Sequence, residues 1–157
     1  MFKKILIPLD GSKLAECALP YAEVLAKGCD TEEIILVSVT ERIKGYQAVE
    51  DHGEPLGERL LPVAVGKKEA QAQRYLGKIA KALEAKGIKA RAEVLLGNPA
   101  EELEIFTRHN DIDMIVMSSH GRSGPSRWAH GSVADKVFRA SCAPVLMVRA
   151  PGCVAGI

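Results

Sequence analysis

The stretch that decides the fold is Met114-Ile115-Val116-Met117-Ser118-Ser119-His120-Gly121, followed after nine residues by Gly131-Ser132. An apolar run here ends in small residues, a loop passes through glycine, and a helical pattern begins at Gly131-Ser132. Glycine lets backbone N–H groups approach an anion closely, and a helix start adds unpaired donors and the positive end of a dipole. The stretch therefore predicts either a site that holds phosphates or a plain strand–loop–helix connection.

Apolar runs and helical patterns alternate along the rest of the chain. Strands are predicted over residues 5–9, 34–39, 88–96, 114–117 and 145–148, and helices over residues 14–25, 72–83, 98–106 and 132–140. Strands that alternate with helices argue for βαβ units and a parallel sheet, and right-handed crossovers place helices on both of its faces. We therefore expect one α/β domain over residues 1–150, with a loose tail at 151–157.

Two local signals concern the helices. Asn98 can cap a helix, Pro99 suits its first position, and Glu101 lies where a capping-box carboxylate reaches back. Residues 41–66 carry several glycines and prolines but no sustained period. This segment is therefore predicted to be a long variable loop or a partly helical insertion.

Composition narrows the class of protein. A chain of 157 residues suits one domain, and its 21 Lys and Arg against 20 Asp and Glu point to no nucleic-acid partner. No apolar stretch is long enough to span a membrane, and the apolar run after Lys4 is too short for a secretory signal. We expect a cytoplasmic protein without a membrane partner, in which Cys17 and Cys142 act as small apolar residues.

Polar groups gather where two of the predicted strands end. Ligands of open parallel sheets bind outside the carboxyl ends of the strands, where the winding direction switches. The first strand ends in Pro8-Leu9-Asp10-Gly11-Ser12, so the Asp10 carboxylate is expected at this edge. It can accept hydrogen bonds from ribose hydroxyls, or it can hold a turn or cap the next helix, since Asp-Gly-Ser is a common turn sequence.

The loop of the opening stretch offers further candidates, each with a structural alternative. Ser132 can bind a phosphate oxygen or cap the helix, because the four residues that it opens match a capping box. Arg122 and Arg127 can bind phosphates or remain solvated loop charges. His120 can contact a phosphate or orient the loop, and Trp128 can cover a ligand or pack under the loop.

Several catalytic motifs are absent from the sequence. It contains no Gly-x-x-x-x-Gly-Lys-[Ser/Thr] loop, no Gly-x-Gly-x-x-Gly after the first strand, no Gly-x-Ser-x-Gly elbow and no His-Glu-x-x-His. The residues thus offer parts of a nucleotide site without an evident base or nucleophile. This combination favours binding over catalysis.

The chain resembles the universal stress protein family over essentially its whole length. The matching segments are residues 3–12, 34–39, 116–124, 131–137 and 142–148. The resemblance implies a Rossmann-like, five-stranded parallel sheet in the order 3-2-1-4-5, of the adenine nucleotide alpha hydrolase type. It also implies a homodimer in which the last strand, Val145–Val148, pairs antiparallel with its copy, which would close an open apolar edge.

One branch of this family binds ATP through Gly-x-x-Gly, nine residues, and then Gly-Ser or Gly-Thr. Ser118 replaces the first glycine here, whereas Gly121, Gly131 and Ser132 match. The resemblance implies a site for ATP, or for AMP or ADP, with Mg²⁺ bound alongside the phosphates. The residues implied for this site are Pro8, Asp10, Val39, Ser118, His120, Gly121, Arg122, Gly131, Ser132 and Val133.

The implied function is that of a dimeric sensor or regulator in stress responses, with at most slow hydrolysis. In such a site Asp10 meets the ribose, and Pro8 and the Val39 backbone meet the adenine. The alternative is a dimeric interaction module of the same fold that binds no nucleotide. Ser118 favours this alternative, and residues 41–66 would then form a partner surface.

Overall fold

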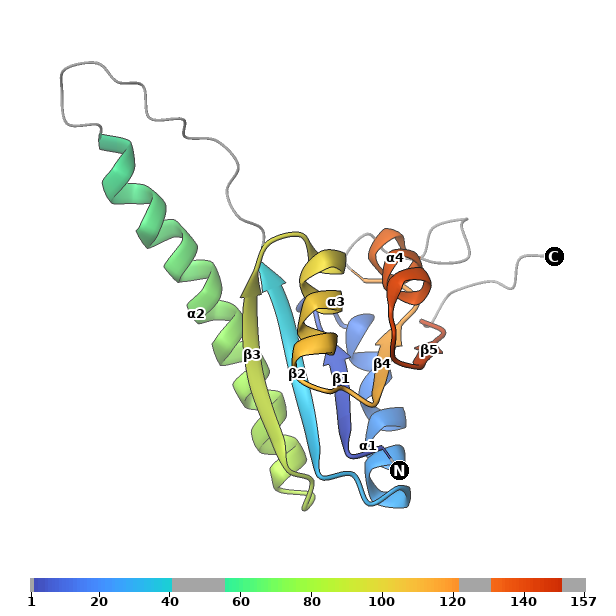
Figure 1. Cartoon of the computed structure of the whole chain (residues 1–157). Helices are drawn as coiled ribbons and strands as arrows, with labels where there is room; N and C mark the ends of the chain where they lie inside the picture. Colours follow the sequence, from blue (N-terminus) through green and yellow to red (C-terminus); the bar gives the residue numbers. More distant parts are fainter. Residues whose placement is uncertain (1, 41–55, 122–130, 151–157) are drawn as a thin grey trace.

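A single parallel sheet with helices on both faces forms the part of the chain that the structure describes (Figure 1). The computed structural model describes residues 2–40, 56–121 and 131–150. Within these ranges the strands are β1 (Lys4–Pro8), β2 (Glu33–Thr40), β3 (Ala90–Leu96), β4 (Met114–Ser118) and β5 (Val145–Val148). They lie in the order β3-β2-β1-β4-β5, and every pairing is parallel. The predicted fold class and strand order are confirmed.

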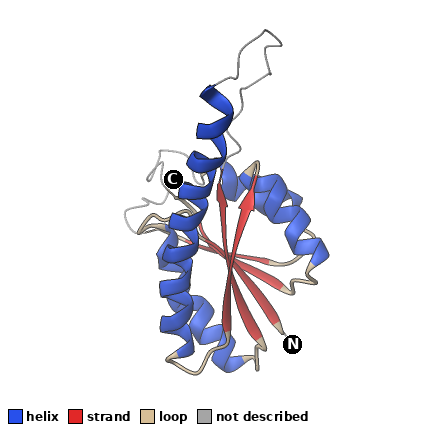
Figure 2. Cartoon of the chain, turned by 90° about the vertical axis from the view of Figure 1, so that its left-hand side faces the viewer, coloured by secondary structure: helices blue, strands red, loops and turns tan. Residues whose placement is uncertain are grey.

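Helices cover the two faces of this sheet in pairs (Figure 2). A short 3₁₀ helix, η1 (Ala15–Ala18), leads into α1 (Leu19–Gly28), and α2 (Leu56–Glu84) covers the same face. The other face is covered by α3 (Pro99–His109) and α4 (Ser132–Ala140). Of the helices in the described ranges, none combines the length and the apolar character needed to cross a membrane.

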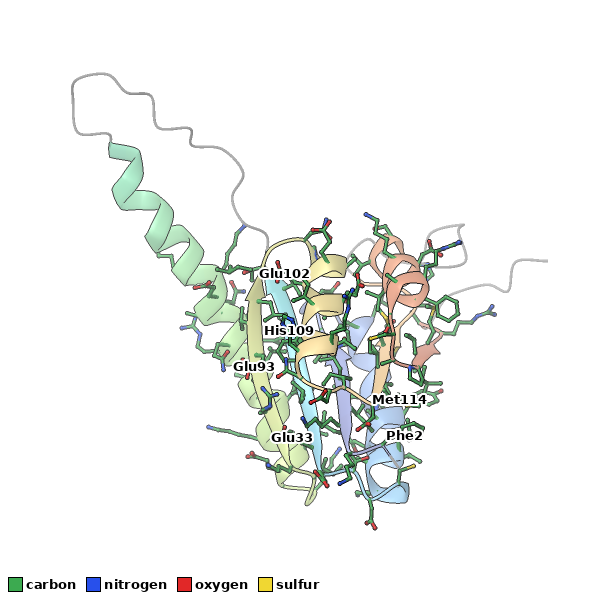
Figure 3. The ribbon with its side chains drawn as sticks, in the orientation of Figure 1. Phe2, Glu33, Glu93, Glu102, His109 and Met114 are labelled. Atoms are coloured by element: carbon green, nitrogen blue, oxygen red, sulfur yellow. The ribbon has the colours of Figure 1, made fainter. Side chains whose placement is uncertain are left out.

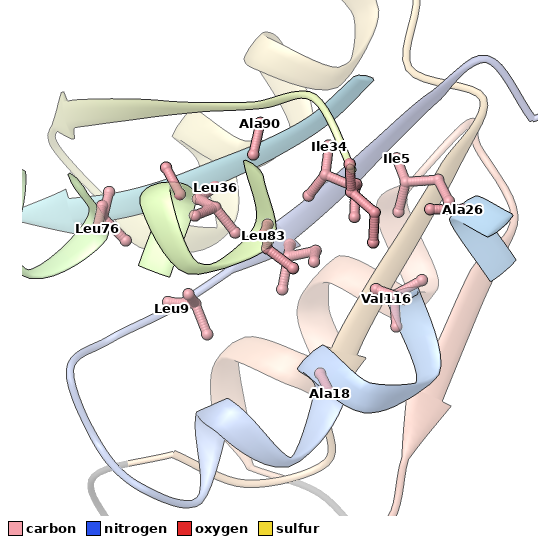
Figure 4. Close-up of a cluster of buried hydrophobic side chains, with 14 of the residues drawn as sticks. Ile5, Leu9, Ala18, Ala26, Ile34, Leu36, Leu76, Leu83, Ala90 and Val116 are labelled. Carbon is pink, nitrogen blue, oxygen red and sulfur yellow. The ribbon is translucent and has the colours of Figure 1, made fainter. Parts of the chain in front are cut away.

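Successive side chains of the central strands enter different halves of the core. Ile5 and Ile7 of β1 pack on the α1–α2 side together with Leu76 and Leu83 of α2, whereas Leu6 packs on the α3–α4 side (Figure 4). This alternation follows from the period of two in a β-strand. Because both faces are covered there, the central strands β1, β2 and β4 read as nearly continuous apolar runs.

The cysteine prediction holds at one position and fails at the other. Cys17 is partly buried and packs against the core on the α1–α2 side. Cys142 is exposed, so the expectation that it acts as a small apolar core residue is wrong. It follows the end of α4 by two residues, where the chain passes over the surface to β5.

The long helix α2 begins before the point at which apolar residues start to recur at helical spacing. The sequence pattern starts at Ala72, but the helix begins at Leu56, so residues 56–66 are the helical part of the predicted insertion. Residues 41–55 lie outside the described ranges. The first turns of α2 extend past the strand ends (Figure 1), where no sheet is present to select an amphipathic period. This geometry explains why the sequence pattern shows only the second half of the helix.

The start of α3 is capped as predicted, by one residue of the expected pair. Asn98 Oδ1 accepts a hydrogen bond from the backbone N–H of Ala100 at 3.2 Å. The carboxylate that lies back over the helix start is that of Glu102, not Glu101, and it occupies the space beside Gly97 (Figure 3). The capping-box role predicted for Glu101 is therefore wrong, and its neighbour Glu102 packs over the helix start instead.

Replacing the capping residue should lower stability measurably. We expect Asn98→Ala to reduce the free energy of unfolding by about 1 kcal/mol, because the Ala100 N–H loses its acceptor. Asn98→Asp keeps an acceptor and adds a favourable charge at the helix start, so it should remain near the wild-type value. Equilibrium urea denaturation measures both. Equal stability of the alanine variant and the wild type would contradict the capping role.

The edge strand β3 is tied to β2 by charged side chains. The guanidinium of Arg91 pairs with Glu33 of β2 at 3.0 Å and with Glu93 on its own strand (Figure 3). Charges of this kind discourage uncontrolled pairing at an edge. At the amino edge of the sheet, a hydrogen bond and charge attraction between Lys3 and Glu32 raise the pKa of Lys3 and lower the pKa of Glu32. Both ion-pair groups lie away from the carboxyl edge.

Candidate functional site

A cavity of about 820 Å³ lies outside the carboxyl ends of β1, β2 and β4. The starts of α3 and α4 and one face of α2 complete its lining. The strands β1 and β4 are the two neighbours between which the winding direction switches, and this is where open α/β sheets bind ligands. The sequence-predicted residues that line it are Pro8, Asp10, Val39, Ser118, His120, Gly121, Gly131, Ser132 and Val133.

The remaining candidates from the sequence are not placed by the structure. Arg122, Arg127 and Trp128 lie outside the described residues. Their roles in binding stay predictions, as do the binding roles of the residues that line the cavity. The sequence-predicted residues that line the cavity come from four separate segments of the chain.

Asp10 performs the turn role that the sequence suggested as one of its alternatives. Its Oδ1 accepts a hydrogen bond from the Ser12 N–H at 2.9 Å, and Ser12 Oγ in turn accepts from the Ala15 N–H at 3.1 Å. These two bonds fix the turn from β1 into η1. The second carboxylate oxygen, Oδ2, faces Gly121. One oxygen therefore holds the turn while the other lies at the cavity.

Gly121 allows the two strand-end loops to approach each other. A Cβ at this position would overlap Asp10 Oδ2 and lie 3.1 Å from Asp10 Cγ. The glycine thus permits the close approach, because a side chain here would have to displace the carboxylate. The glycine motif after β4 and the Asp10 turn after β1 are therefore in direct contact at the edge of the cavity.

The start of α4 faces the cavity with its backbone. Gly131 is the N-cap residue, in an extended conformation without a side-chain cap, and Ser132 is the first helical residue. The capping-box interpretation of Ser132 is therefore wrong, and Asp135 pairs instead with Arg139 at 3.0 Å. The Gly131 N–H donates to the Ser119 carbonyl at 2.7 Å, which joins the helix start to the end of β4.

This helix start is suited to an anion. The first N–H groups of an α-helix have no acceptor inside the helix, and the helix dipole is positive at this end. Ser132, Val133 and Ala134 are the first three residues of α4, and all three line the cavity. The arrangement matches the general pattern by which helix starts bind phosphate groups.

The last residue of β4, Ser118, and the two residues after it are buried and hydrogen-bonded to one another. The hydroxyl oxygen of Ser118 accepts from the Cys17 thiol and from the His120 N–H, each at 3.4 Å. Ser119 Oγ lies 3.1 Å from His120 Nδ1 and accepts from the Ala150 N–H at 3.1 Å. The serine that replaces the first motif glycine therefore has its hydroxyl engaged by the protein, toward η1 and the following loop.

Sequence reasoning missed the wall that α2 adds to the cavity. This wall, which we call the α2 wall, consists of Lys68, Gln71, Ala72 and Tyr75. The signal was present, because these positions lie on one face at helical spacing. The core positions Leu76 and Leu83 follow on the same helix. The same helical spacing therefore marks both the residues that pack on the sheet and those that line the cavity.

Four titratable side chains from the described part of the chain line the cavity. They are Asp10, Lys68, Tyr75 and His120, and Asp10 also holds a turn. Among the described residues, no group of three or more His, Cys, Asp or Glu side chains could hold a metal ion. A divalent cation at this site would therefore depend on oxygens that a ligand supplies.

Fold and cavity together define the class of protein. A parallel sheet in the order 3-2-1-4-5, with its cavity at the switch point, is a Rossmann-like domain of the adenine nucleotide alpha hydrolase type. The model of the universal stress protein family matches residues 1–149. The chain belongs to the universal stress protein family.

Relatives of known sequence and structure support this assignment over nearly the whole chain. Universal stress protein MJ0531 of Methanocaldococcus jannaschii is 35% identical over 153 residues, which cover 96% of this chain and 84% of the relative. MJ0577 of the same organism is 31% identical over 164 residues, or 95% of this chain and 96% of the relative. The solved structure of MJ0577 superposes with a TM-score of 0.82 over 97% of this chain and 99% of that chain.

Two more distant structures contain adenine nucleotides. The Arabidopsis thaliana family protein At3g01520 with AMP bound is 14% identical and has a TM-score of 0.61, covering 96% of this chain and 93% of that chain. A universal stress protein in complex with cAMP is 19% identical and has a TM-score of 0.63, covering 95% of this chain and 98% of that chain. At these identities the likeness concerns the fold alone.

Proposed function

We propose that this chain is a cytoplasmic, dimeric protein that binds ATP in the cavity at the carboxyl edge and acts as a sensor or regulator in stress responses. The observation that carries the proposal is the meeting of the Asp10 carboxylate, Gly121 and the start of α4 at one cavity. A nucleotide site needs an acceptor for the ribose hydroxyls and donors for the phosphates, and these features supply both. The AMP and cAMP complexes of relatives support an adenine nucleotide as the ligand.

Each part of the cavity has a role in this proposal. The N–H groups at the start of α4, with the Ser132 hydroxyl, bind the phosphates, and Gly121 keeps the opposite loop close. Asp10 accepts from the ribose hydroxyls. Pro8 and the Val39 backbone contact the adenine. Mg²⁺ enters with the phosphates, since it binds few protein carboxylates and keeps phosphate and water oxygens as ligands. AMP or ADP would occupy the same place with fewer phosphate contacts.

The ribose contact can be tested without disturbing the turn. Asp10→Asn keeps an oxygen that accepts from the Ser12 N–H but removes the negative charge at the cavity. Because a hydrogen bond to a charged group contributes about 1.5–3 kcal/mol, we expect the affinity for Mg-ATP to fall about 10-fold or more. Isothermal titration calorimetry measures this loss, and thermal unfolding should show an unchanged midpoint.

The ligand itself provides the control for this variant. With 2′,3′-dideoxy-ATP, which lacks the ribose hydroxyls, wild type and Asp10→Asn should bind equally. An equal loss for both nucleotides would mean that Asp10 acts on the cavity as a whole and not on the ribose. If the wild-type protein fails to bind nucleotide at millimolar concentration, the proposed function is wrong.

The dimer rests on the open edge of the sheet. Among the described strands β5 pairs with β4 alone, and Leu146 on this strand is 36% exposed. Phe138 on the neighbouring helix α4 is 58% exposed. Antiparallel pairing of two β5 strands across a two-fold axis would satisfy the edge and cover apolar surface.

A charge at the edge should separate the protomers. We expect Leu146→Lys to sediment as a monomer at concentrations where the wild type is a dimer, because lysine at an edge strand opposes pairing. Val24→Lys is the control, since Val24 is also an exposed apolar residue but lies on α1. Sedimentation velocity distinguishes the two, and a dimeric Leu146→Lys variant would place the interface elsewhere.

The alternative function is an interaction module that binds no nucleotide. Ser118 at the first motif position favours it, because the motif of the ATP-binding branch has glycine there. The two proposed functions differ in whether the purified protein contains bound nucleotide. Nucleotide released on denaturation, seen as absorbance near 260 nm and identified by chromatography, would support the ATP-binding proposal.

A further inference from the structure

The strand order and the cavity lining indicate the direction in which a nucleotide with its phosphates at α4 would extend. The start of α4 adjoins the end of β4, and β1 lies between β4 and β2 in the sheet. Neighbouring strands are about 4.8 Å apart, so β2 is about 10 Å from β4. A nucleotide with its phosphates at α4 would therefore extend across β1 and bring its base toward Val39 and Thr40 at the end of β2, which line the same cavity.

The α2 wall stands at that end of the cavity. The helix packs against β2 and β3 and extends past their ends (Figure 1). Leu76 and Leu83 anchor it in the core (Figure 4). The Tyr75 hydroxyl donates to Glu16 Oε1 at 3.2 Å, which links the wall to η1. The wall thus has a fixed backbone beside the place where the base would lie.

The polar groups of the α2 wall differ in what they can recognise. The Lys68 ammonium only donates hydrogen bonds. Gln71 carries both a donor and an acceptor and lines the cavity, and its side chain makes no hydrogen bond within the described ranges of the chain. Ala72 is small and leaves room in front of the helix. Gln71 is therefore the wall residue able to pair with a group that donates and accepts side by side.

We infer that Gln71 is the specificity-determining residue that selects adenine over guanine, an inference that rests on the proposed nucleotide site. At the edge of the base that carries N7, adenine offers the N6 amino donor next to the N7 acceptor, and an amide pairs with both at once. At the same edge guanine offers two acceptors, O6 and N7, and leaves the amide oxygen without a donor. The amide of Gln71, facing this N7 edge, thus matches adenine and mismatches guanine.

The test combines a change in the protein with a change in the base. Isothermal titration calorimetry would measure Mg-ATP, Mg-GTP and Mg-N6,N6-dimethyl-ATP, which lacks the amino donor, against full-length wild type, Gln71→Ala and Gln73→Ala. Gln73 is the matched control, because it is exposed on the same helix but does not line the cavity. Circular dichroism would verify that the variants fold.

The decisive measurement is the selectivity for ATP over GTP and the dimethyl analogue, and not the affinity for ATP alone. We expect Gln71→Ala to lose about 10-fold in affinity for ATP, while GTP and the dimethyl analogue change by less than about 2-fold. Gln73→Ala should equal the wild type for every ligand. If Gln71→Ala binds ATP as the wild type does, or weakens all three nucleotides equally, the inference is wrong and the proposed function stands. If the wild type binds no nucleotide, both fail.

Discussion

Gly131→Asp is expected to lower the affinity for Mg-ATP by at least about 100-fold while leaving the fold as stable as before or more so. Gly131 is the N-cap of α4 and supplies no side-chain cap, and aspartate is among the preferred residues at this position. A Cβ there would lie 3.4 Å from the Ser119 carbonyl oxygen, an ordinary contact. The new carboxylate would bind the N–H groups that a phosphate needs and would repel the phosphate as well.

Opposite effects on stability and binding make this prediction sharp. Thermal unfolding without nucleotide should show a midpoint equal to or above that of the wild type, and calorimetry should show the loss of ATP binding. Gly131→Asn has the same shape without the charge and should bind ATP more tightly than Gly131→Asp. Wild-type affinity in the aspartate variant would exclude the start of α4 as the phosphate site.

Gly121→Ala should have the second largest effect, again with an affinity loss of about 100-fold. The added methyl group would displace the Asp10 carboxylate, whose Cγ would be 3.1 Å from the new Cβ. Asp10 would then lose its geometry toward both the Ser12 N–H and the ribose. The loss of one turn hydrogen bond should reduce the free energy of unfolding by about 1 kcal/mol.

A second glycine provides the matched control for this variant. Gly77 lies inside α2, and a Cβ there would meet no atom within 4 Å. Gly77→Ala should raise stability by up to about 1 kcal/mol, because alanine is the better helix former, and should leave ATP affinity unchanged. Urea denaturation and calorimetry compare the two alanine variants directly. Equal ATP affinity in both would show that the close approach at Gly121 is not needed.

The strands could be predicted from the sequence because burial on both faces leaves a strong signal. Residues 5–8 and 34–39, for example, are apolar runs that the structure places in β1 and β2. The meeting of Asp10 with Gly121 could be anticipated only as a shared sheet edge. The contact between them depends on two loops whose geometry no short-range pattern encodes.

The cap of α4 and the cavity-facing side of α2 could not be predicted from the sequence, for identifiable physical reasons. The Ser132 pattern satisfies a capping box, yet the helix uses Gly131 as its cap, since glycine and serine are both acceptable there. For α2, the spacing of Gln71 and Tyr75 is the same as that of core residues. Whether such a face meets a sheet or a cavity depends on how far the helix extends past the strands.

The division of α2 into two stretches affects how the family can diversify. Lys68 and Gln71 of the α2 wall lie more than one turn before the anchoring residue Leu76, whereas Tyr75 packs against the core beside it. Substitutions at Lys68 and Gln71 therefore leave the packing against the sheet intact, because free energies of distant, independent sites are additive. Ligand preference can drift in this protein while the scaffold stays constant, so close relatives with superimposable backbones need not respond to the same metabolite.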